Sequence, residues 1–352
     1  MKRFKSIMLA ALAIFVVAGL IPAPSASAQS SALSIAPRKD YVIESGDSVE
    51  DKLTVRNLDT THDLQLYLQV IDFTYTDDSG TPKLLLDTDA EPTPWSLRNF
   101  LTAPATAKVK AGGSVTIPIK IKIPKEIGAG GYYSAIVYST SAPSGGNLGL
   151  AASGVTLAFA NVPGPVKQDL KLQKFGAYNA QAKTYKYFNF NEPTVMGYTL
   201  LNNGNMYEAP TGTIKLKSMW GFQYDIQNVN PNKSLALIGQ ERTFQACIKL
   251  AAQKVDFQGS KSEANSCVSP GLWPGLYTAS IDLFYGQNGN PTKEITKTVH
   301  FWYLPLWFVI VALIVILAIA FYVWRTIVWL RGGSFKLGGR PQARTKSSRR
   351  RR

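Results

Sequence analysis

Val115-Thr-Ile-Pro-Ile-Lys-Ile-Lys-Ile123 places a branched apolar residue at every odd position and a polar residue or proline at every even position. The side chains of a β-strand point alternately to the two faces of a sheet, so this segment predicts a strand with one buried and one solvated face. Pro118 has no backbone N–H to offer a neighbouring strand, and we therefore expect the strand at an edge of its sheet. Apolar residues alternate in the same way from Leu64 to Val70. Together these patterns favour an all-β fold.

Two short motifs recur along the chain at nearly the same offset. Leu53-Thr-Val-Arg-Asn57 returns as Tyr198-Thr-Leu-Leu-Asn202, an offset of 145 between the two asparagines. Gly131-Tyr-Tyr-Ser-Ala-Ile-Val-Tyr138 returns as Gly275-Leu-Tyr-Thr-Ala-Ser-Ile281, an offset of 144 between the aligned glycines. Two landmarks at nearly one offset indicate an internal repeat, and hence two copies of one kind of domain.

The second motif is similar to the start of strand F in immunoglobulin-like sandwiches, where a tyrosine hydroxyl bonds back to the backbone at a corner of the sheet. Tyr133 and Tyr277 are the candidates for that structural role. The sequence therefore predicts two tandem immunoglobulin-like β-sandwiches, the first at residues 34–162 and the second at residues 166–303. Pro163-Gly164-Pro165 cannot continue a strand ladder and is expected to be the hinge between them.

An uncharged run from Leu304 to Trp324 is long and apolar enough to cross a bilayer as one helix. Trp307 near one end and Trp324 at the other lie where interfacial aromatic residues are typical, and Arg325 follows at once. Residues 325–352 contain ten Lys or Arg and no Asp or Glu. This bias predicts a cytoplasmic tail that contacts anionic lipids, with the preceding part of the chain outside the cell.

The N-terminus has the features of a secretory signal peptide over residues 1–28. Basic residues precede an apolar stretch from Ile7 to Ile21, and Ala26-Ser27-Ala28 offers a small-residue cleavage site. We therefore expect an exported, single-pass protein of the cell membrane that is anchored by its own helix. The second sandwich would lie close to the bilayer, and the first would be the more accessible to a ligand.

The net charge of +15 belongs almost entirely to the two ends of the chain. The signal peptide contributes +3 and the tail +10, which leaves +2 for the part between them. A nearly neutral ectodomain provides no electrostatic footprint for a polyanion, so we expect no nucleic-acid partner.

Cys247 and Cys267 are the only cysteines, and in an exported region they predict a structural disulfide. Closing a loop of this size contributes roughly 3 kcal/mol in the chain-entropy model. The only histidines, His62 and His300, are far apart in the predicted architecture. We therefore expect no catalytic residues, no metal site and no cofactor.

Asp77-Asp78-Ser79-Gly80 and Asp87-Thr-Asp-Ala-Glu91 are the densest acidic clusters. Such carboxylates could hold Ca²⁺, or they could supply a carboxylate pair for glycoside hydrolysis. The first cluster is, however, typical of a hairpin turn, and neither has the spacing of a known calcium loop. We expect a turn and a solvated loop, and whether residues 77–91 bind a cation stays open.

Aromatic residues are concentrated in two segments of the second predicted sandwich, namely Tyr185, Tyr187, Phe188 and Phe190 in one and Trp220, Phe222 and Tyr224 in the other. If exposed, these rings would suit stacking on sugars or anchoring a protein partner. Strands favour aromatic residues for packing, so we expect them in the core.

The chain resembles the membrane-anchored WxL-interacting proteins of Gram-positive-type bacteria. The matching residues are Gly46 with Leu53-Thr-Val-Arg-Asn57, Ile123-Pro124 and Gly130-Gly131-Tyr132-Tyr133. The architecture of signal peptide, two sandwiches, helix and basic tail also matches. This resemblance implies a first domain that binds peptidoglycan and a second that binds surface-protein partners. A looser resemblance to pilus-chaperone-like sandwiches and other bacterial immunoglobulin-like surface modules is also present.

The leading hypothesis is a non-enzymatic cell-surface protein that binds or scaffolds a cell-wall polymer or another surface protein next to the lipid bilayer. An exported hydrolase with a carboxylate pair between Asp72 and Glu91 is one alternative. An assembly chaperone that works by strand donation is another, and it requires an exposed strand edge such as the one at Val115–Ile123. The binding residues are not predicted.

Overall fold

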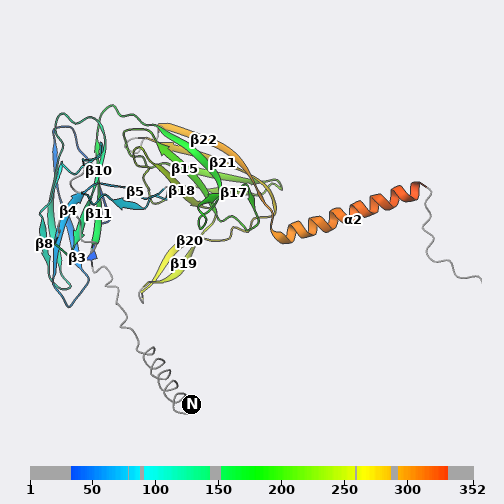
Figure 1. Ribbon diagram of the computed structural model, residues 1–352, viewed down its shortest axis with the longest axis horizontal. Coiled ribbons are helices and arrows are strands. Elements are labelled where there is room, and N and C mark those ends of the chain that lie inside the picture. The colour runs from blue at the N-terminus through cyan, green and yellow to red at the C-terminus, as the bar shows by residue number, and fades with distance from the viewer. Residues whose placement is uncertain are drawn as a thin grey trace, which may run out of the picture. The chain divides into compact units, whose positions relative to one another are not determined.

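The alternating segment around Pro118 forms most of strand β9 (Ser114–Lys122), with its odd-numbered side chains buried and its even-numbered ones exposed. The computed structural model of the chain describes residues 33–77, 79–87, 91–142, 152–257, 260–286 and 292–331 (Figure 1). The predicted signal peptide and most of the predicted tail lie outside these residues. Strands dominate the described part, which confirms a mostly β fold with a single apolar helix near its C-terminal end.

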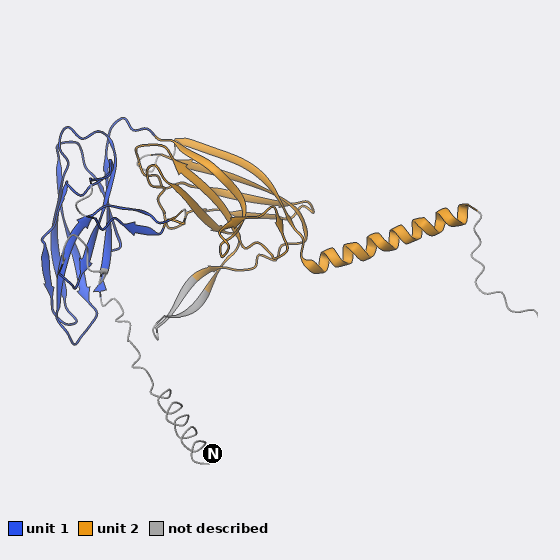
Figure 2. Cartoon of the chain, viewed as in Figure 1, with its two compact units in different colours: residues 1–76, 81–167 blue, residues 77–80, 168–352 orange. Residues whose placement is uncertain are grey.

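The chain divides into two compact units, shown in blue and orange in Figure 2. Unit 1 comprises Met1–Thr76 with Thr81–Lys167, and unit 2 comprises Asp77–Gly80 with Gln168–Arg352.

Unit 1 contains a four-stranded sheet, a five-stranded sheet and a small hairpin. The four-stranded sheet has the order β1 (Leu33–Ser34), β3 (Ser48–Asn57), β9, β7 (Leu101–Thr102). The five-stranded sheet has the order β2 (Arg38–Val42), β11 (Ala152–Val162), β10 (Gly130–Ser139), β4 (Leu64–Ile71), β8 (Thr106–Val109). The hairpin consists of β5 (Phe73–Tyr75) and β6 (Pro82–Leu84). All of these strand pairs are antiparallel except β2 with β11.

The two large sheets of unit 1 share one apolar core and therefore form a β-sandwich. Val55 and Ile117 from the four-stranded sheet belong to the same buried cluster as Leu66 and Ile136 from the five-stranded sheet. The alternation that predicted half-buried strands is thus explained by two sheets that bury one face each.

Unit 2 repeats this plan. Its four-stranded sheet has the order β13 (Thr184–Tyr185), β12 (Leu170–Asn179), β15 (Val195–Asn202), β18 (Glu241–Cys247). Its five-stranded sheet has the order β14 (Phe188–Asn189), β22 (Lys293–Tyr303), β21 (Gly275–Tyr285), β16 (Thr211–Ser218), β17 (Gln223–Ile226). Tyr198 and Phe244 from the first sheet and Ile281 and Phe301 from the second lie in one buried cluster.

A disulfide joins Cys247 to Cys267 and confirms the predicted bridge. The stretch between the cysteines, expected only as a closed loop, contains the hairpin of β19 (Leu250–Phe257) and β20 (Ser260–Cys267). The bridge links the end of β18 to the end of β20, so it ties this hairpin to the four-stranded sheet of unit 2.

Helix α2 (Leu306–Leu330) is, in the described part of the chain, the one helix long and apolar enough to cross a membrane. It differs from the predicted span of 304–324 at both ends. Leu304 precedes Pro305, and a residue before proline is disfavoured in the helical region, so the helix starts after the proline. Arg325 lies inside the helix rather than after it, because a charge does not end a helix. Between Pro305 and Gly332 the sequence contains no glycine or proline that would end the helix.

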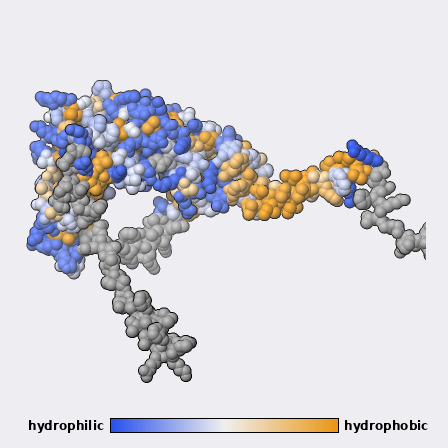
Figure 3. Space-filling model, in the orientation of Figure 1, coloured by the Kyte–Doolittle hydropathy of each residue, from blue (hydrophilic) through white to orange (hydrophobic). Residues whose placement is uncertain are grey.

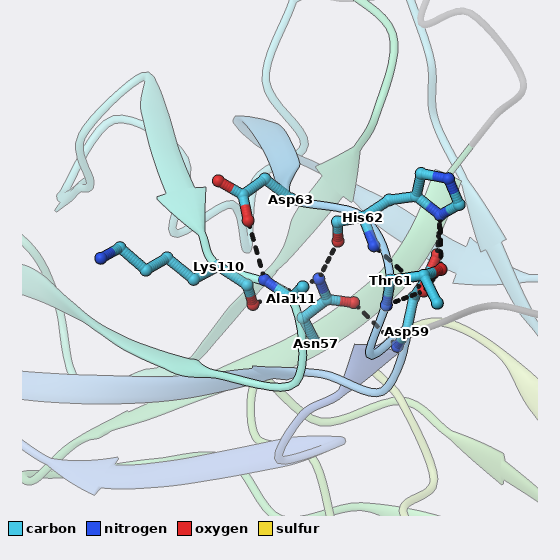
Figure 4. A network of polar contacts seen from close by, with 7 residues as sticks. All are labelled: Asn57, Asp59, Thr61, His62, Asp63, Lys110 and Ala111. Carbon is cyan, nitrogen blue, oxygen red and sulfur yellow. Dashed lines mark hydrogen bonds and ion pairs between the residues drawn. The ribbon is translucent and has the colours of Figure 1, made fainter.

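The internal repeat is visible as the same buried asparagine in each unit. The side chain of Asn57 donates from Nδ2 to the carbonyls of His62 (2.8 Å) and Lys110 (3.3 Å), and its Oδ1 accepts the N–H of Asp59 (Figure 4). Asn202 does the same with the carbonyls of Met206 (2.7 Å) and Ala236 (2.9 Å) and the N–H of Gly204. Both side chains are fully buried.

The tyrosine that bonds back to the backbone is Tyr277 in unit 2 and Tyr132 in unit 1. The Tyr277 hydroxyl donates to the carbonyl of Trp273 (2.8 Å), as predicted, and that of Tyr132 donates to the carbonyl of Gly128 (2.9 Å). The prediction of Tyr133 was therefore wrong by one residue. Tyr133 is a fully buried ring that packs against Phe73 with centroids 5.2 Å apart. With Tyr132 in this role, both landmarks share the offset of 145, from 57 to 202 and from 132 to 277.

These hydroxyls predict a modest but specific effect on stability. Burial raises the pKa of Tyr277 to about 12, so the hydroxyl is a donor at any physiological pH. Tyr277→Phe and Tyr132→Phe each remove one hydrogen bond and should each lower the free energy of unfolding of their own unit by about 1 kcal/mol. Urea unfolding of the detergent-solubilised chain, read by pulse proteolysis of each unit, measures this. Tyr187→Phe, on an exposed ring, is the control that should change nothing.

Candidate functional site

The outer side of β9 is covered over only part of its length. On its inner side β9 pairs with β3 from Arg56↔Ser114 to Ser48↔Lys122. On its outer side β7 pairs with it only at Leu101↔Ile121 and Thr102↔Lys120. From Ser114 to Ile119 no described strand pairs with this side. The predicted edge character of the strand is therefore confirmed over its first six residues, Ser114 to Ile119.

Two hydrogen bonds show which residues present their backbone groups to the open side. The N–H of Lys122 donates to Phe100 next to β7, and the N–H of Ile123 donates to Asp47 next to β3. Successive residues of a strand direct these groups to opposite sides, so the even-numbered residues of β9 face outward. The open edge thus offers the backbone groups of Ser114 and Thr116 and the carbonyl of Pro118.

Pro118 sits where it costs β9 no hydrogen bond to β3. It lies opposite Lys52 in the register, and its missing N–H would have pointed to the open side. A proline here removes one donor from the edge, which is a known way of discouraging unspecific pairing between edge strands. The edge keeps its other outward groups, so it remains able to pair with a strand whose register avoids position 118.

The edge is open because the chain leaves the four-stranded sheet after Thr102. Pro104 has no N–H with which to extend β7, and the carbonyl of Ala105 already accepts the N–H of Leu68 in the five-stranded sheet. This crossing leaves a hollow of about 460 Å³ beside β9, lined in part by Thr102, Ala103, Pro104, Pro118 and Ile119. The open edge therefore has an apolar recess next to it.

The open part of β9, from Ser114 to Ile119, is uncharged, which distinguishes it from the edges of β2 and β22. Ser114 to Ile119 contains no charged residue. The outer edge of β2 in the same unit carries Arg38, Lys39 and Asp40, and the exposed strand β22 in unit 2 carries Lys293, Glu294 and Lys297. Charged residues on an edge hinder the addition of another strand. Of these three edges, β9 is the one suited to accept a strand.

Four charged residues also line the hollow, and three of them, Glu50, Asp51 and Lys120, form ion pairs. Lys120 Nζ lies 2.8 Å from Glu50 Oε1 and lowers the pKa of Glu50 by hydrogen bonding to it. Asp51 accepts hydrogen bonds from Lys39 Nζ and from the Tyr41 hydroxyl, both at 2.9 Å, and the Lys39 bond is the main cause of its lowered pKa. Burial of the ring, and after it the hydrogen bond to Asp51, raises the pKa of Tyr41. The bonds from Lys39 and Tyr41 join β2 to β3, and the Lys120–Glu50 pair joins β9 to β3. These pairs limit the net charge around the recess.

Two acidic residues of the region proposed for hydrolysis, Asp72 and Asp77, make structural contacts. Asp72 is buried and accepts hydrogen bonds from Ser96 Oγ (2.6 Å), Ser134 Oγ (3.0 Å) and the N–H of Thr93 (3.0 Å). Both of its oxygens are thereby engaged in holding three segments of unit 1 together. Asp77 accepts the N–H of Ser79 in the turn between β5 and β6, which confirms the predicted hairpin turn.

The remaining residues of the acidic region are not brought together into a site by the described part of the chain. Asp78 and Asp89 lie outside the described residues. Among the described residues, no group of three or more His, Cys, Asp and Glu is placed to hold a metal ion. His62 bonds to Asp59 in a turn of unit 1, and His300 bonds to Thr278 in unit 2, so the two histidines serve separate local contacts.

The prediction that the aromatic segments of the second sandwich are core residues was largely wrong. Tyr187, Phe188, Phe190, Trp220 and Phe222 are each more than half exposed, and Tyr185 and Tyr224 are partly buried. These segments form turns and very short strands at the border of the sheets, where a side chain has no second sheet above it. Spacing alone could not distinguish this from a core strand.

None of the residues named for structural or anchoring roles lies at the open edge of β9. Cys247, Cys267 and Tyr277 belong to unit 2, and Trp307, Trp324 and Arg325 belong to α2. The sequence identified the strand and its proline, but not the residues of the recess. The sequence signal that could have identified them is Thr102-Ala103-Pro104, which places a proline two residues after the end of a short strand.

Comparisons with known proteins give a weak structural likeness only. No protein-family model matches the chain, and no curated protein sequence matches it. Among solved structures, the chain is similar to the class 5 fimbriae chaperone CfaA, with 11% identity, a TM-score of 0.36, and coverage of 78% of this chain and 100% of the chaperone. The E. coli chaperone DraB is 13% identical with a TM-score of 0.32, and the match covers 75% of this chain and 97% of DraB. The Pseudomonas aeruginosa CupB2 chaperone is 8% identical with a TM-score of 0.28, and the match covers 74% of this chain and 96% of the chaperone. Likeness at this level does not establish a shared function.

Proposed function

We propose that this chain is a non-enzymatic, membrane-anchored surface protein whose first unit binds an extended segment of a partner protein as an additional strand on β9. The observation that carries the proposal is the uncharged edge from Ser114 to Ile119, with which no strand of the described residues pairs on the outer side. The recess beside it combines apolar residues with charged ones. Strand addition obtains affinity from main-chain hydrogen bonds and specificity from pockets that take alternate side chains. The edge supplies the first and the recess supplies the second.

The proposed role is that of an assembly chaperone or scaffold, which holds a surface protein through a segment that is unpaired until assembly. The proposal includes removal of residues 1–28 on export, a span by α2, and a cytoplasmic basic tail, so that both units face outward. We further propose that residues 34–162 and 166–303 are the two domains and that both are immunoglobulin-like sandwiches. The matched asparagine and tyrosine bonds of the two units support that assignment. A wall polymer is not favoured by any feature of the open edge.

Backbone substitutions at the edge test the proposal directly. Thr116→Pro removes an outward N–H without removing a hydrogen bond to β3. It should weaken binding of the partner about fivefold, because the net contribution of one hydrogen bond is roughly 1 kcal/mol. Thr116→Val keeps the N–H and is the matched control that should bind as the unchanged protein does. Pro118→Val adds an outward N–H and should strengthen binding, or add self-association, to a similar extent.

The measurement is retention of solubilised surface proteins, and separately of purified cell-wall sacculi, by the full chain in nanodiscs. Hydrogen exchange provides a second readout. The Thr116 amide should exchange rapidly in the free protein and slowly in the complex. Equal binding by all three variants, or full protection of Thr116 before any partner is added, would contradict strand addition. Retention on sacculi that is independent of these variants, with no protein retained, would favour a polymer ligand instead.

A further inference from the structure

One end of the five-stranded sheet of unit 2 carries a row of exposed apolar side chains, which we call the sheet-end patch: Tyr187, Phe188, Met219, Trp220, Phe222 and Trp273. Each of these side chains is more than half exposed. A soluble monomer rarely presents a contiguous patch of this kind, and such a patch usually marks a surface of interaction. Figure 3 shows hydrophobic side chains gathered over this end of unit 2, where β22 runs into α2.

The strand register shows that these residues lie at the same end of the sheet. Phe188 of β14 pairs with Trp302 of β22, and Trp302 pairs with Leu276 of β21. The N–H of Met219, directly after β16, donates to the carbonyl of Leu276 (2.8 Å). Phe222, directly before β17, accepts the N–H of Ser218 through its carbonyl (2.8 Å). The row therefore crosses all five strands.

Further contacts fix the side chains on this end. The indole N–H of Trp220 donates to the carbonyl of Pro274 (2.7 Å), which holds the ring over the start of β21. The rings of Tyr187 and Phe188 meet edge to face with centroids 4.8 Å apart. The patch is thus a built surface rather than a set of loose side chains.

The covalent connection places this end of the sheet next to the start of α2. β22 ends at Tyr303 and α2 begins at Leu306, so only Leu304 and Pro305 lie between them. Three Cα–Cα steps span at most about 11 Å. The headgroup layer on each side of a bilayer is roughly 5–8 Å thick. If α2 crosses a membrane, the end of β22 lies at or within reach of that layer, whatever the tilt of the helix.

The composition of the patch fits this location. Tryptophan and tyrosine are enriched at membrane interfaces, where an apolar ring and a polar N–H or O–H are both accommodated. Lys186 precedes Tyr187 and Lys217 lies two residues before Met219, and both lysines are exposed. Cationic side chains beside aromatic ones are typical of a surface that meets lipid headgroups.

We infer that the sheet-end patch of unit 2 is embedded in the headgroup layer of the membrane that α2 spans. This inference rests on the proposed span by α2. It makes unit 2 a part of the anchor, with its five-stranded sheet ending on the lipid surface. A partner protein that covers the same patch is the alternative occupant, and the experiment below distinguishes the two.

The test uses single fluorescent labels on the full chain in phospholipid nanodiscs. Both native cysteines are consumed by the disulfide, so one introduced cysteine is the only free thiol. Phe222→Cys and Phe188→Cys place an environment-sensitive label at the two sides of the row. Thr211→Cys, exposed at the opposite end of β16, is the matched control. Retention of the helix in the bilayer is checked on the same samples by alkaline extraction.

The labels at 222 and 188 should be several-fold less accessible to aqueous iodide than the label at 211, and several-fold more strongly quenched by headgroup-attached spin labels. Iodide access equal to that at 211, with α2 retained in the bilayer, would overturn the inference and leave the anchor intact. Shielding from iodide without quenching by lipid would also overturn it, because it would identify a protein contact. Loss of the chain on alkaline extraction would overturn the span and the inference together.

Discussion

Asn57→Ala is expected to lower the free energy of unfolding of unit 1 by about 3 kcal/mol and to leave unit 2 unchanged. The substitution removes the two Nδ2 bonds to the carbonyls of His62 and Lys110 and the bond from the N–H of Asp59. These backbone groups belong to the turn after β3 and to the loop before β9. Without Asn57 they would be left partly buried and without hydrogen-bond partners. Asn202→Ala should have the same effect on unit 2.

Urea unfolding of the detergent-solubilised chain, followed by pulse proteolysis of each unit, measures both losses in one sample. Asn57→Asp keeps an acceptor for the N–H of Asp59 but turns a carboxylate toward two carbonyls, so it should destabilise unit 1 at least as much as alanine does. Asn99→Ala, at an exposed position of unit 1, should change nothing. If Asn57→Ala lowered the free energy of unfolding of both units equally, the asparagine would not act only on its own unit.

Unit 2 is expected to lose about 3 kcal/mol of stability as the pH rises from about 4 to about 8, because of Glu208. This carboxyl is buried, and burial raises its pKa from 4.5 to about 7 although the N–H of Gly286 hydrogen-bonds to it. No described residue hydrogen-bonds to Oε1. The folded state therefore holds the proton more tightly than the unfolded state. Stability is fully present below pH 4.5 and falls until the pH has passed 7.

Glu208→Gln mimics the protonated side chain and provides the test. The variant should match the unchanged protein near pH 4 and exceed it by about 3 kcal/mol near pH 8, with unit 1 showing no difference. The measurement is the urea midpoint of unit 2 across this range by pulse proteolysis. A parallel pH dependence of the unchanged protein and the variant would exclude Glu208 as the cause.

The parts of the fold that depend on periodicity could be predicted from the sequence. The alternation around Pro118 predicted a half-buried edge strand because a sheet buried on one face imposes a period of two. The repeat predicted two similar units, and the chemistry of exported thiols predicted the disulfide. Helix α2 was predicted from its apolar length, but its ends were not, since they depend on Pro305 and on the absence of a helix breaker near Arg325.

Features set by tertiary contacts could not be predicted. Matching Gly131 to Gly275 selected Tyr133, whereas the hydrogen bond belongs to Tyr132, because the bond depends on the distance back to the carbonyl of Gly128. The exposure of Phe188 and Trp220 depends on whether other parts of the fold pack over them, and the amino-acid composition does not show this. The recess beside β9 exists because the chain changes sheets after Thr102, and only the topology shows this crossing.

The direct passage from β22 into α2 also determines how the protein responds to force. β22 pairs with β21 over its whole length, from Gly275↔Tyr303 to Tyr285↔Lys293. In the proposed topology, a pull between a partner bound to unit 1 and a helix α2 that spans the membrane would act on Tyr303 at the end of β22. The hydrogen bonds of an antiparallel ladder are perpendicular to its strands, so such a pull strains all of them at once instead of opening them one after another. If α2 spans the membrane as proposed, the pairing of β22 with β21 therefore bears the load between the anchor and the rest of unit 2.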